Sequence, residues 1–206
     1  MRAFLPILLL LGAAPASPPG TVRVRLDTAA GPITLALDGA HAPKTTANFL
    51  LYVDDGRLDG ASFFRAARRK VGAGGFVEGG IGNDPRRLLP PVPLEPTSRT
   101  GLRHVDGAVS MARFDAPGSA TGNFSISVGA NPDMDATARD PGYAVFGRVM
   151  SGMDVVKRIL AQPTSAGGAG AMKGQGIARP VRIVRAVRLD GVARPTGRPK
   201  PWTIGL

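Results

Sequence analysis

A chain of 206 residues with 43% hydrophobic and 20% charged residues has the composition of an ordinary globular domain. At this length the chain can bury a core without disulfides, and it contains no cysteine at all. The lack of cysteine excludes zinc–thiolate sites, iron–sulfur clusters and thiol nucleophiles. Only two histidines occur, His41 and His104, so a histidine-rich metal site is excluded and no metal is expected.

The formal net charge of +11 is unusual, and it is concentrated near the C-terminus. Residues 157–206 carry ten basic side chains and a single acidic one, Asp190. A smaller basic group comprises Arg65, Arg68, Arg69 and Lys70. Such a balance favours an anionic partner. An arginine-rich composition inherited from a GC-rich genome explains it equally well.

The N-terminal segment has the features of a secretory signal peptide. Arg2 precedes an apolar run over residues 4–14, and Ala14-Pro15-Ala16 offers small residues for cleavage. The run is too short to span a bilayer. We therefore expect residues 1–16 to be removed and the mature chain to be exported, to the periplasm or the medium. The alternative is an uncleaved, buried N-terminal helix.

The remaining chain shows short strand patterns interrupted by two helical patterns. Val22–Leu26 alternates apolar and basic residues, which is typical of a half-buried strand. Further strands are expected at Ile33–Leu37, Ala61–Phe64, Phe76–Glu78, Ala108–Ala112, Phe124–Val128, Val145–Val149 and Val181–Leu189.

Two segments have helical signals. Pro43 opens the first helix, which Gly56 ends. The second covers Met153–Ala161, with Ser151 as the expected N-cap. Many short strands with only two helices favour an all-β barrel or sandwich. Residues 17–191 form the expected domain, and residues 192–206 a basic, proline-containing tail without a core of its own.

Three motifs carry the functional signal. Ala42-Pro43-Lys44-Thr45-Thr46-Ala47-Asn48-Phe49 comes first, and Phe63-Phe64-Arg65 follows, with Phe76-Val77-Glu78-Gly79-Gly80 after a spacer. The third is Gly107-Ala108-Val109-Ser110-Met111-Ala112-Arg113, leading to Gly122-Asn123-Phe124-Ser125-Ile126. In this order and spacing, from about Val22 to Gly191, they resemble the cyclophilin family of peptidyl-prolyl cis–trans isomerases.

The resemblance implies a mainly β fold: a closed, eight-stranded antiparallel barrel capped by two α-helices. It implies an isomerase of Xaa-Pro bonds that needs no metal or cofactor. Arg65 matches the catalytic arginine of the family's F-x-R motif; read alone, it is one more surface arginine.

The resemblance also places substrate-binding residues around Arg65. Met111, Ala112 and Arg113 match the groove edge that offers backbone polar groups. Asn123 stands at the family's usual Gln, and Phe124 either contacts substrate or belongs to the core. Met134 and Tyr143 match the far wall of the proline pocket, or are ordinary packing at the barrel rim.

Three departures from the family pattern concern the pocket itself. Ser125 replaces a second Phe that forms the pocket floor, which removes apolar area that would grip proline. Glu78 replaces the usual Gln beside Arg65 and is expected to pair with it. The family's P-x-F segment is altered, which leaves Phe76 as the candidate aromatic wall.

These observations predict an isomerase that assists the folding of exported proteins, with an altered and weakened proline pocket. The alternative is a peptide-binding or chaperone module of the same fold, with little or no catalysis, in the cell envelope. Proline-containing polypeptides are the expected partners and a monomer the expected state. No nucleic acid is expected, because aromatic residues are few. Weak electrostatic contact with anionic envelope surfaces is a further expectation.

Overall fold

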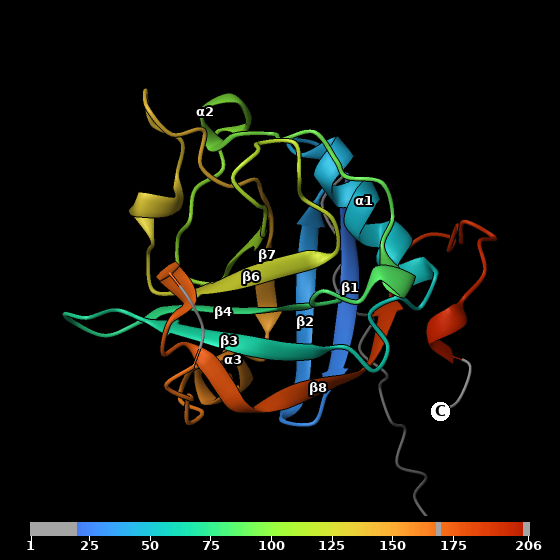
Figure 1. The fold of residues 1–206 in the computed structure, drawn as a ribbon. Coiled ribbons are helices and arrows are strands. Elements are labelled where there is room, and N and C mark those ends of the chain that lie inside the picture. The colour runs from blue at the N-terminus through green and yellow to red at the C-terminus, as the bar shows by residue number, and fades with distance from the viewer. Residues whose placement is uncertain (1–19, 168–169, 204–206) are drawn as a thin grey trace, which may run out of the picture.

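Eight antiparallel strands close into one barrel in the computed structural model, which describes residues 20–167 and 170–203. Around the barrel the strand order is β1-β2-β7-β5-β6-β4-β3-β8 (Figure 1). The strands are β1 (Thr21–Thr28), β2 (Gly31–Asp38), β3 (Ser62–Arg68), β4 (Gly75–Gly80), β5 (Ala108–Met111), β6 (Asn123–Val128), β7 (Val145–Ser151) and β8 (Gly176–Arg188). The predicted closed eight-stranded barrel is thus confirmed.

Alternation along the strands builds the core. In β1 the side chains of Val24 and Leu26 are fully buried, whereas Arg25 is exposed, as the sequence pattern predicts. At the centre of the core Phe49 of the first helix packs against Phe124 and Phe146, with ring centroids 5.2 and 5.1 Å apart. Side chains on one face of each strand therefore fill the barrel interior, and those on the other face lie on its outer side.

Two helices cover opposite ends of the barrel (Figure 1). They are α1 (Pro43–Asp54), which opens on proline as expected, and α3 (Met153–Leu160). The predicted cap at Ser151 is wrong: Ser151 ends β7, and Gly152, in the left-handed region at φ 90°, is the N-cap residue of α3.

A third, one-turn helix was not expected from the sequence. It is α2 (Thr97–Thr100), which follows Pro96 and ends at Gly101 in the left-handed region at φ 75°. Among the described residues, no helix has the length and apolar character needed to cross a membrane.

The C-terminal segment docks on the barrel, although it has no core of its own. Trp202 is only 3% exposed, and the guanidinium groups of Arg57 and Arg87 lie 4.5 and 5.6 Å from its ring. Thr196 donates hydrogen bonds from its backbone N–H and its hydroxyl to the buried carboxylate of Asp55, at 2.6 and 2.5 Å. The segment packs against the end of α1, as the red trace in Figure 1 shows. The expected signal peptide and residues 204–206 lie outside the described residues.

Candidate active site

A row of four polar side chains crosses four neighbouring strands on the outer face of the barrel. The strand register pairs Arg65 with Glu78, Glu78 with Ser125, and Ser125 with Ser110. The next residues along these strands, such as Ala66, belong to the core. Because side chains alternate between faces, the register places all four polar groups on one side of the sheet.

Arg65 is held by partners from two other parts of the chain. Its Nη1 donates to Oε2 of Glu78 at 2.9 Å, and its Nε donates to Oε1 of Gln175 at 2.8 Å. The guanidinium carbon lies 5.0 Å from the ring centre of Phe76. Arg65 and Glu78 keep 16% and 12% of their side-chain surfaces exposed, so the pair is partly buried but reachable from solvent. The predicted Arg65–Glu78 pair and the proximity of Phe76 are thus present.

Two buried hydroxyl groups lie next to Glu78 in this row. The Oγ atoms of Ser125 and Ser110 lie 2.9 Å apart, and both residues are buried. Each hydroxyl therefore has a hydrogen-bonding partner that compensates for its burial. Ser127, which pairs with Phe76 in the next row, is also buried, but its hydroxyl has no partner among the described residues. The buried side chains at this point of the row are therefore polar.

The side chains of two predicted site residues, Phe124 and Met111, face the core. Phe124 is fully buried between Phe49 and Phe63, with ring centroids 5.2 and 5.6 Å away. Met111 pairs with Phe124 and is 1% exposed. Both side chains point inward because of strand alternation, so Phe124 takes the core position that was one of its two expected placements, and only the backbone of Met111 is left to face a substrate.

The amide of Asn123 is engaged within the protein. Its Nδ2 donates to the carbonyl of Gly82 at 3.0 Å, and its Oδ1 accepts from the Gly82 N–H at 2.8 Å. The backbone N–H of Ala112 donates to the Asn123 carbonyl at 3.0 Å. In this structure Asn123 thus fixes the loop after β4, and only the remaining hydrogen-bonding capacity of its amide is available to a substrate.

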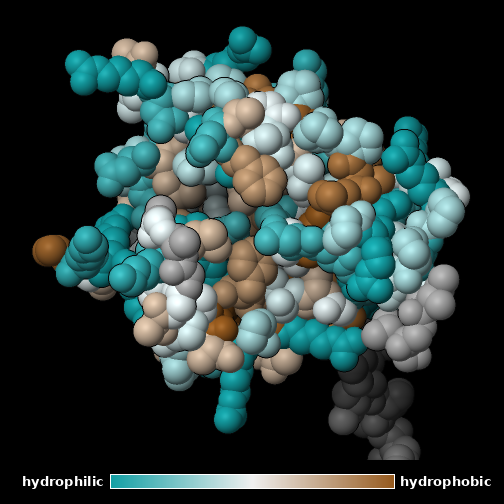
Figure 2. Space-filling model, in the orientation of Figure 1, coloured by the Kyte–Doolittle hydropathy of each residue, from teal (hydrophilic) through white to brown (hydrophobic). Residues whose placement is uncertain are grey.

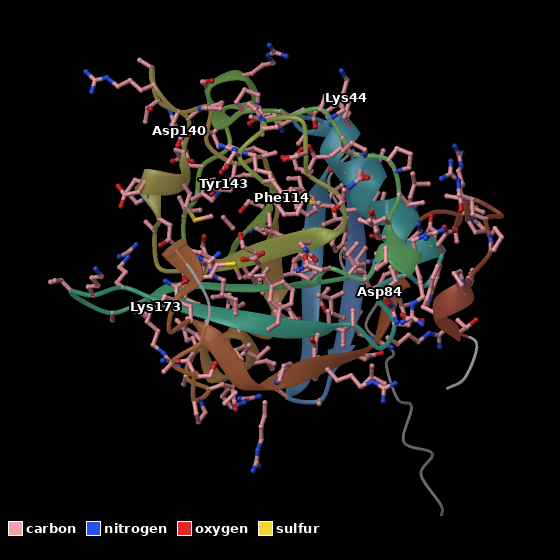
Figure 3. All side chains as sticks on the ribbon, in the orientation of Figure 1. Lys44, Asp84, Phe114, Asp140, Tyr143 and Lys173 are labelled. Atoms are coloured by element: carbon pink, nitrogen blue, oxygen red, sulfur yellow. The ribbon has the colours of Figure 1, made fainter. Side chains whose placement is uncertain are left out.

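Arg113 and Tyr143 are in contact with each other. The guanidinium carbon of Arg113 lies 4.9 Å from the ring centre of Tyr143. Its Nε donates to the carbonyl of Gly142, and its Nη2 lies 3.2 Å from Oδ1 of Asp140. The neighbouring Phe114 is 70% exposed, and Figure 3 shows it close to Tyr143 in projection, above β6. The arginine therefore ties the β5–β6 connection to the segment before β7.

Met134 and Tyr143 come together as predicted, because the N–H of Tyr143 donates to the Met134 carbonyl at 3.1 Å. Beneath them lies a buried pair: Nδ1 of His104 is 2.7 Å from Oδ1 of Asp135. Burial lowers the pKa of His104, against the opposing effect of the Asp135 carboxylate. Nε2 of His104 has no partner among the described residues.

Gln175 is a site residue that sequence reasoning missed. It ends the Gly/Ala-rich segment after α3, and its carbonyl accepts a hydrogen bond from the N–H of Ala66 at 2.9 Å. Its side chain reaches Arg65 across 110 residues of sequence. The one available signal was a lone amide residue beside the glycines that precede the last strand.

No group of three or more His, Cys, Asp or Glu side chains that would hold a metal lies within residues 20–167 and 170–203. A hollow of about 350 Å³, lined by Ala36, Ala108 and Gly147 among others, lies on β2, β5 and β7 and includes no predicted site residue. What the groove offers is a fixed guanidinium beside an aromatic ring, a combination suited to holding a polypeptide and stabilising charge on it.

A closed barrel with an arginine positioned in this way defines the class of cyclophilin-like proteins, and comparison with known proteins agrees. The family model described as cyclophilin type peptidyl-prolyl cis-trans isomerase/CLD matches residues 21–188. The chain belongs to this family and is an enzyme of that type.

Two curated relatives are bacterial. The chain is 41% identical over 140 residues to the peptidyl-prolyl cis-trans isomerase cyp18 of Streptomyces antibioticus, covering 66% of this chain and 81% of the relative. It is 38% identical over 161 residues to the peptidyl-prolyl cis-trans isomerase A of Dickeya dadantii, covering 77% and 82%.

A solved structure supports the fold. The crystal structure of a cyclophilin type isomerase of Cryptosporidium parvum superposes with a TM-score of 0.66 at 18% identity, covering 84% of this chain and 99% of that one. The same protein, solved in the presence of the dipeptide Ala-Pro, gives 0.65 at 20% identity, covering 82% and 99%.

Proposed function

We propose that this isomerase acts on Xaa-Pro bonds of exported proteins, as a monomer, through a proline pocket that binds weakly. The observation that carries the proposal is the position of Arg65, held from two sides in a groove that is apolar at Phe76 and polar at Ser125.

The mechanism follows from the peptide bond. Rotation faces a barrier of ~18–20 kcal/mol because C–N resonance must be broken. Twisting the bond localises a lone pair on the prolyl nitrogen, to which a guanidinium can donate a hydrogen bond. That bond forms in the twisted state and not in either planar state, so it lowers the barrier. Glu78 and Gln175 occupy Nη1 and Nε of Arg65 and thereby fix the plane of the donor.

Weak binding follows from the pocket floor. A buried Phe contributes ~1.5–3 kcal/mol through its apolar surface. With Ser125 and Ser110 in its place, we expect the affinity for proline segments to be about ten- to a hundredfold lower than with an aromatic floor. The serine pair is satisfied internally, so it offers a proline ring neither apolar area nor an open polar partner.

Proline isomerisation of short Xaa-Pro peptides, followed by NMR exchange, tests the role of Arg65. We expect Arg65→Ala to lose at least about a hundredfold in kcat/KM, the magnitude typical of removing one such donor. Circular dichroism and the unfolding midpoint confirm that the barrel is intact. Arg25→Ala, at an exposed position on β1, is the matched control and should retain full activity. Equal rates for wild type and Arg65→Ala would refute the catalytic role.

The floor is tested with Ser125→Phe in the same assay. We expect a lower KM with kcat little changed, because the added ring binds the planar and twisted states alike. An unchanged KM in a folded variant would contradict the weak-pocket proposal. That variant is best made together with Ser110→Ala, so that no hydroxyl is left buried without a partner.

Export rests on the N-terminal pattern of a charged start, an apolar run and small residues before Ser17. Fusion to a phosphatase reporter that is active only outside the cytoplasm measures it. The full chain should deliver activity and the chain lacking residues 1–16 should not. Mass spectrometry of the exported product should show a new N-terminus near Ser17. Reporter activity independent of residues 1–16 would refute the proposal.

A second candidate function is favoured by one observation, the ion pair between Arg65 and Glu78. A carboxylate that holds the guanidinium also competes with substrate for it, which favours a peptide-binding module with slow catalysis. The two functions differ in one measurement. If the protein is a binding module, Arg65→Ala keeps the affinity of wild type for proline segments and has the same low isomerisation rate. If the protein is an enzyme, Arg65→Ala has a much lower isomerisation rate than wild type.

A further inference from the structure

An unbalanced group of cations lies beside the groove. Between Arg65 and Glu78 the chain has three basic residues and no acidic one. Arg69 and Lys70 are exposed near the tip of the β3–β4 hairpin, which projects from the barrel (Figures 1 and 2). Lys157 of α3 is exposed and lines the same hollow as Arg69, and Lys173 is exposed two residues before Gln175. We refer to Arg69, Lys70, Lys157 and Lys173 as the basic end.

The basic end adjoins the pocket. Arg69 donates from Nη2 to Oδ1 of Asn131 at 3.2 Å, and the carbonyl of Asn131 accepts from the N–H of Met134 at 3.0 Å. In the hairpin, Phe76 pairs with Ala67, two residues before Arg69. Arg69 is thus linked to the two segments that carry Phe76 and Met134.

The charges of the basic end are not neutralised within the described part of the chain. Neither Arg69, Lys70, Lys157 nor Lys173 lies within 4.0 Å of a carboxylate oxygen there. By contrast, Arg113 is paired with Asp140. Arg68 differs from its neighbours, because its guanidinium binds the carbonyls of Leu160 and Gln162 at the end of α3. The basic end therefore carries several cations that no carboxylate of the described residues pairs, beside the segments of Phe76 and Met134.

We propose that the basic end selects substrates, so that the preferred Xaa-Pro segments carry acidic side chains on one side of the proline. This inference rests on the proposed function, because it assigns a substrate class to the same groove. Complementary charge raises the association rate and fixes the direction in which an extended chain lies. A segment with acidic residues on one side meets the basic end in only one of its two orientations.

A substrate fits these observations better than a membrane surface does. The hairpin tip presents one apolar side chain, Val71, which is 88% exposed. One valine buries too little area to hold a protein on a bilayer, since even a single myristoyl chain binds only marginally. Arg69 is instead linked to the segments that carry Phe76 and Met134, two residues of the proposed substrate site. The test must therefore distinguish binding to anionic lipid from a preference for acidic peptides.

The test compares three peptides with the same Ala-Pro centre. One carries two Glu before this centre, one carries two Glu after it, and one carries Gln at all four positions. NMR exchange gives kcat/KM at low salt and at 0.5 M salt. For one of the two Glu peptides we expect about a fivefold higher kcat/KM than for the Gln peptide, decreasing towards equality in high salt.

The variant Lys70→Gln/Lys157→Gln/Lys173→Gln should remove most of this preference and leave the Gln peptide unaffected. Arg69 is kept because it binds Asn131, next to the Met134 segment. Arg68 is kept because it binds the end of α3. The matched control, Arg182→Gln/Arg194→Gln/Arg198→Gln, loses the same charge at exposed positions on β8 and the C-terminal segment, and should keep the preference.

The results distinguish failure of the acidic-substrate proposal from failure of the proposed isomerase function. If wild type turns over the Gln peptide but neither Glu peptide exceeds it by twofold, the proposal is wrong and the isomerase function stands. If no peptide is turned over, the proposed function fails. Peptide binding measured by fluorescence titration then decides the proposal by the same ratio. Binding to vesicles with 30% anionic lipid that the triple variant loses, without a peptide preference, would overturn it in favour of a membrane surface.

Discussion

Nη1 of Arg65 lies 2.9 Å from Oε2 of Glu78, and the two residues face each other in the register of β3 and β4. The carboxylate therefore has two opposed effects. It fixes the guanidinium, and it draws the hydrogen-bond donor away from the prolyl nitrogen. The balance between these effects sets the rate and can be measured.

The variant Glu78→Gln should distinguish the two effects of Glu78, which are to orient the Arg65 guanidinium and to compete with substrate for it. The amide keeps an acceptor oxygen for Nη1 but loses the charge, so Arg65 stays oriented and is more easily drawn to substrate. We expect kcat to rise about two- to fivefold, with KM little changed. Glu78→Ala removes the acceptor as well and should lower kcat. Isomerisation rates measured for the two variants check the pair of expectations. A lower kcat in Glu78→Gln than in wild type would mean that the charge itself is needed.

Gln175 should act through Arg65 without contacting substrate. Removing its side-chain oxygen leaves Nε of Arg65 without this acceptor, and the guanidinium gains freedom to rotate. We expect Gln175→Ala to lower kcat about three- to tenfold while KM stays within twofold, and Gln175→Asn to recover little because it is shorter. Gln162→Ala, in the same segment, is the control. A change confined to KM would instead place Gln175 in substrate binding.

The two side-chain partners of Arg65, Glu78 and Gln175, also show which contacts the sequence can predict and which it cannot. The Glu78 contact was predicted from the resemblance, in which this position lies beside the arginine, and the register of β3 and β4 places the two residues opposite each other. The Gln175 contact crosses 110 residues and depends on the path of an irregular segment. No periodicity encodes such a path, so the sequence predicts the strand contact and not this one.

The strand boundaries likewise include some that the sequence predicts and some that it does not. Val22–Leu26 has a clear alternation and lies within β1. The last strand begins at Gly176 and not at Val181, because pairing with β3 extends it past Pro180. The orientation of Phe124 was left open by the sequence, since both faces of β6 carry residues that suit burial, and closure of the barrel decides it.

The hydroxyl groups of Ser110 and Ser125 should be energetically coupled. Both are buried, and each is the other's hydrogen-bonding partner at 2.9 Å. Ser125→Ala leaves the Ser110 hydroxyl buried and unpaired, which costs about 1–3 kcal/mol. The double variant with Ser110→Ala removes both groups, and we expect it to be less destabilised than the sum of the single variants by about 1 kcal/mol. Urea unfolding of all four proteins measures this; strict additivity would show that the pair does not form in solution.

The docked C-terminal segment should stabilise the fold without affecting the site. Trp202→Ala removes a nearly fully buried ring between Arg57 and Arg87, and such truncations cost about 3–5 kcal/mol. We expect a lower unfolding midpoint and an unchanged kcat/KM at temperatures where the variant is folded. Arg198→Gln, exposed in the same segment, should leave both unchanged. Loss of turnover in folded Trp202→Ala would show that the segment acts on the groove.

Stability should depend on pH through His104. Burial lowers its pKa in the native state below the ordinary value of about 6.5 that applies in the unfolded chain. As the pH falls below about 6.5, the unfolded chain therefore binds a proton that the native state does not, and the free energy of unfolding decreases. The decrease approaches at most about 1.4 kcal/mol per pH unit and stops below the native pKa.

Asp135, 2.7 Å from Nδ1, opposes this shift, and Arg103 lies 4.0 Å from the same carboxylate. Urea unfolding at pH 7.5, 6.5 and 5.5 measures the slope in wild type and in His104→Gln. The variant should lose that part of the slope, because its amide does not titrate, whereas the contribution of the acidic residues is common to both proteins. Equal slopes in the two proteins would mean that His104 binds protons alike in the native and unfolded states.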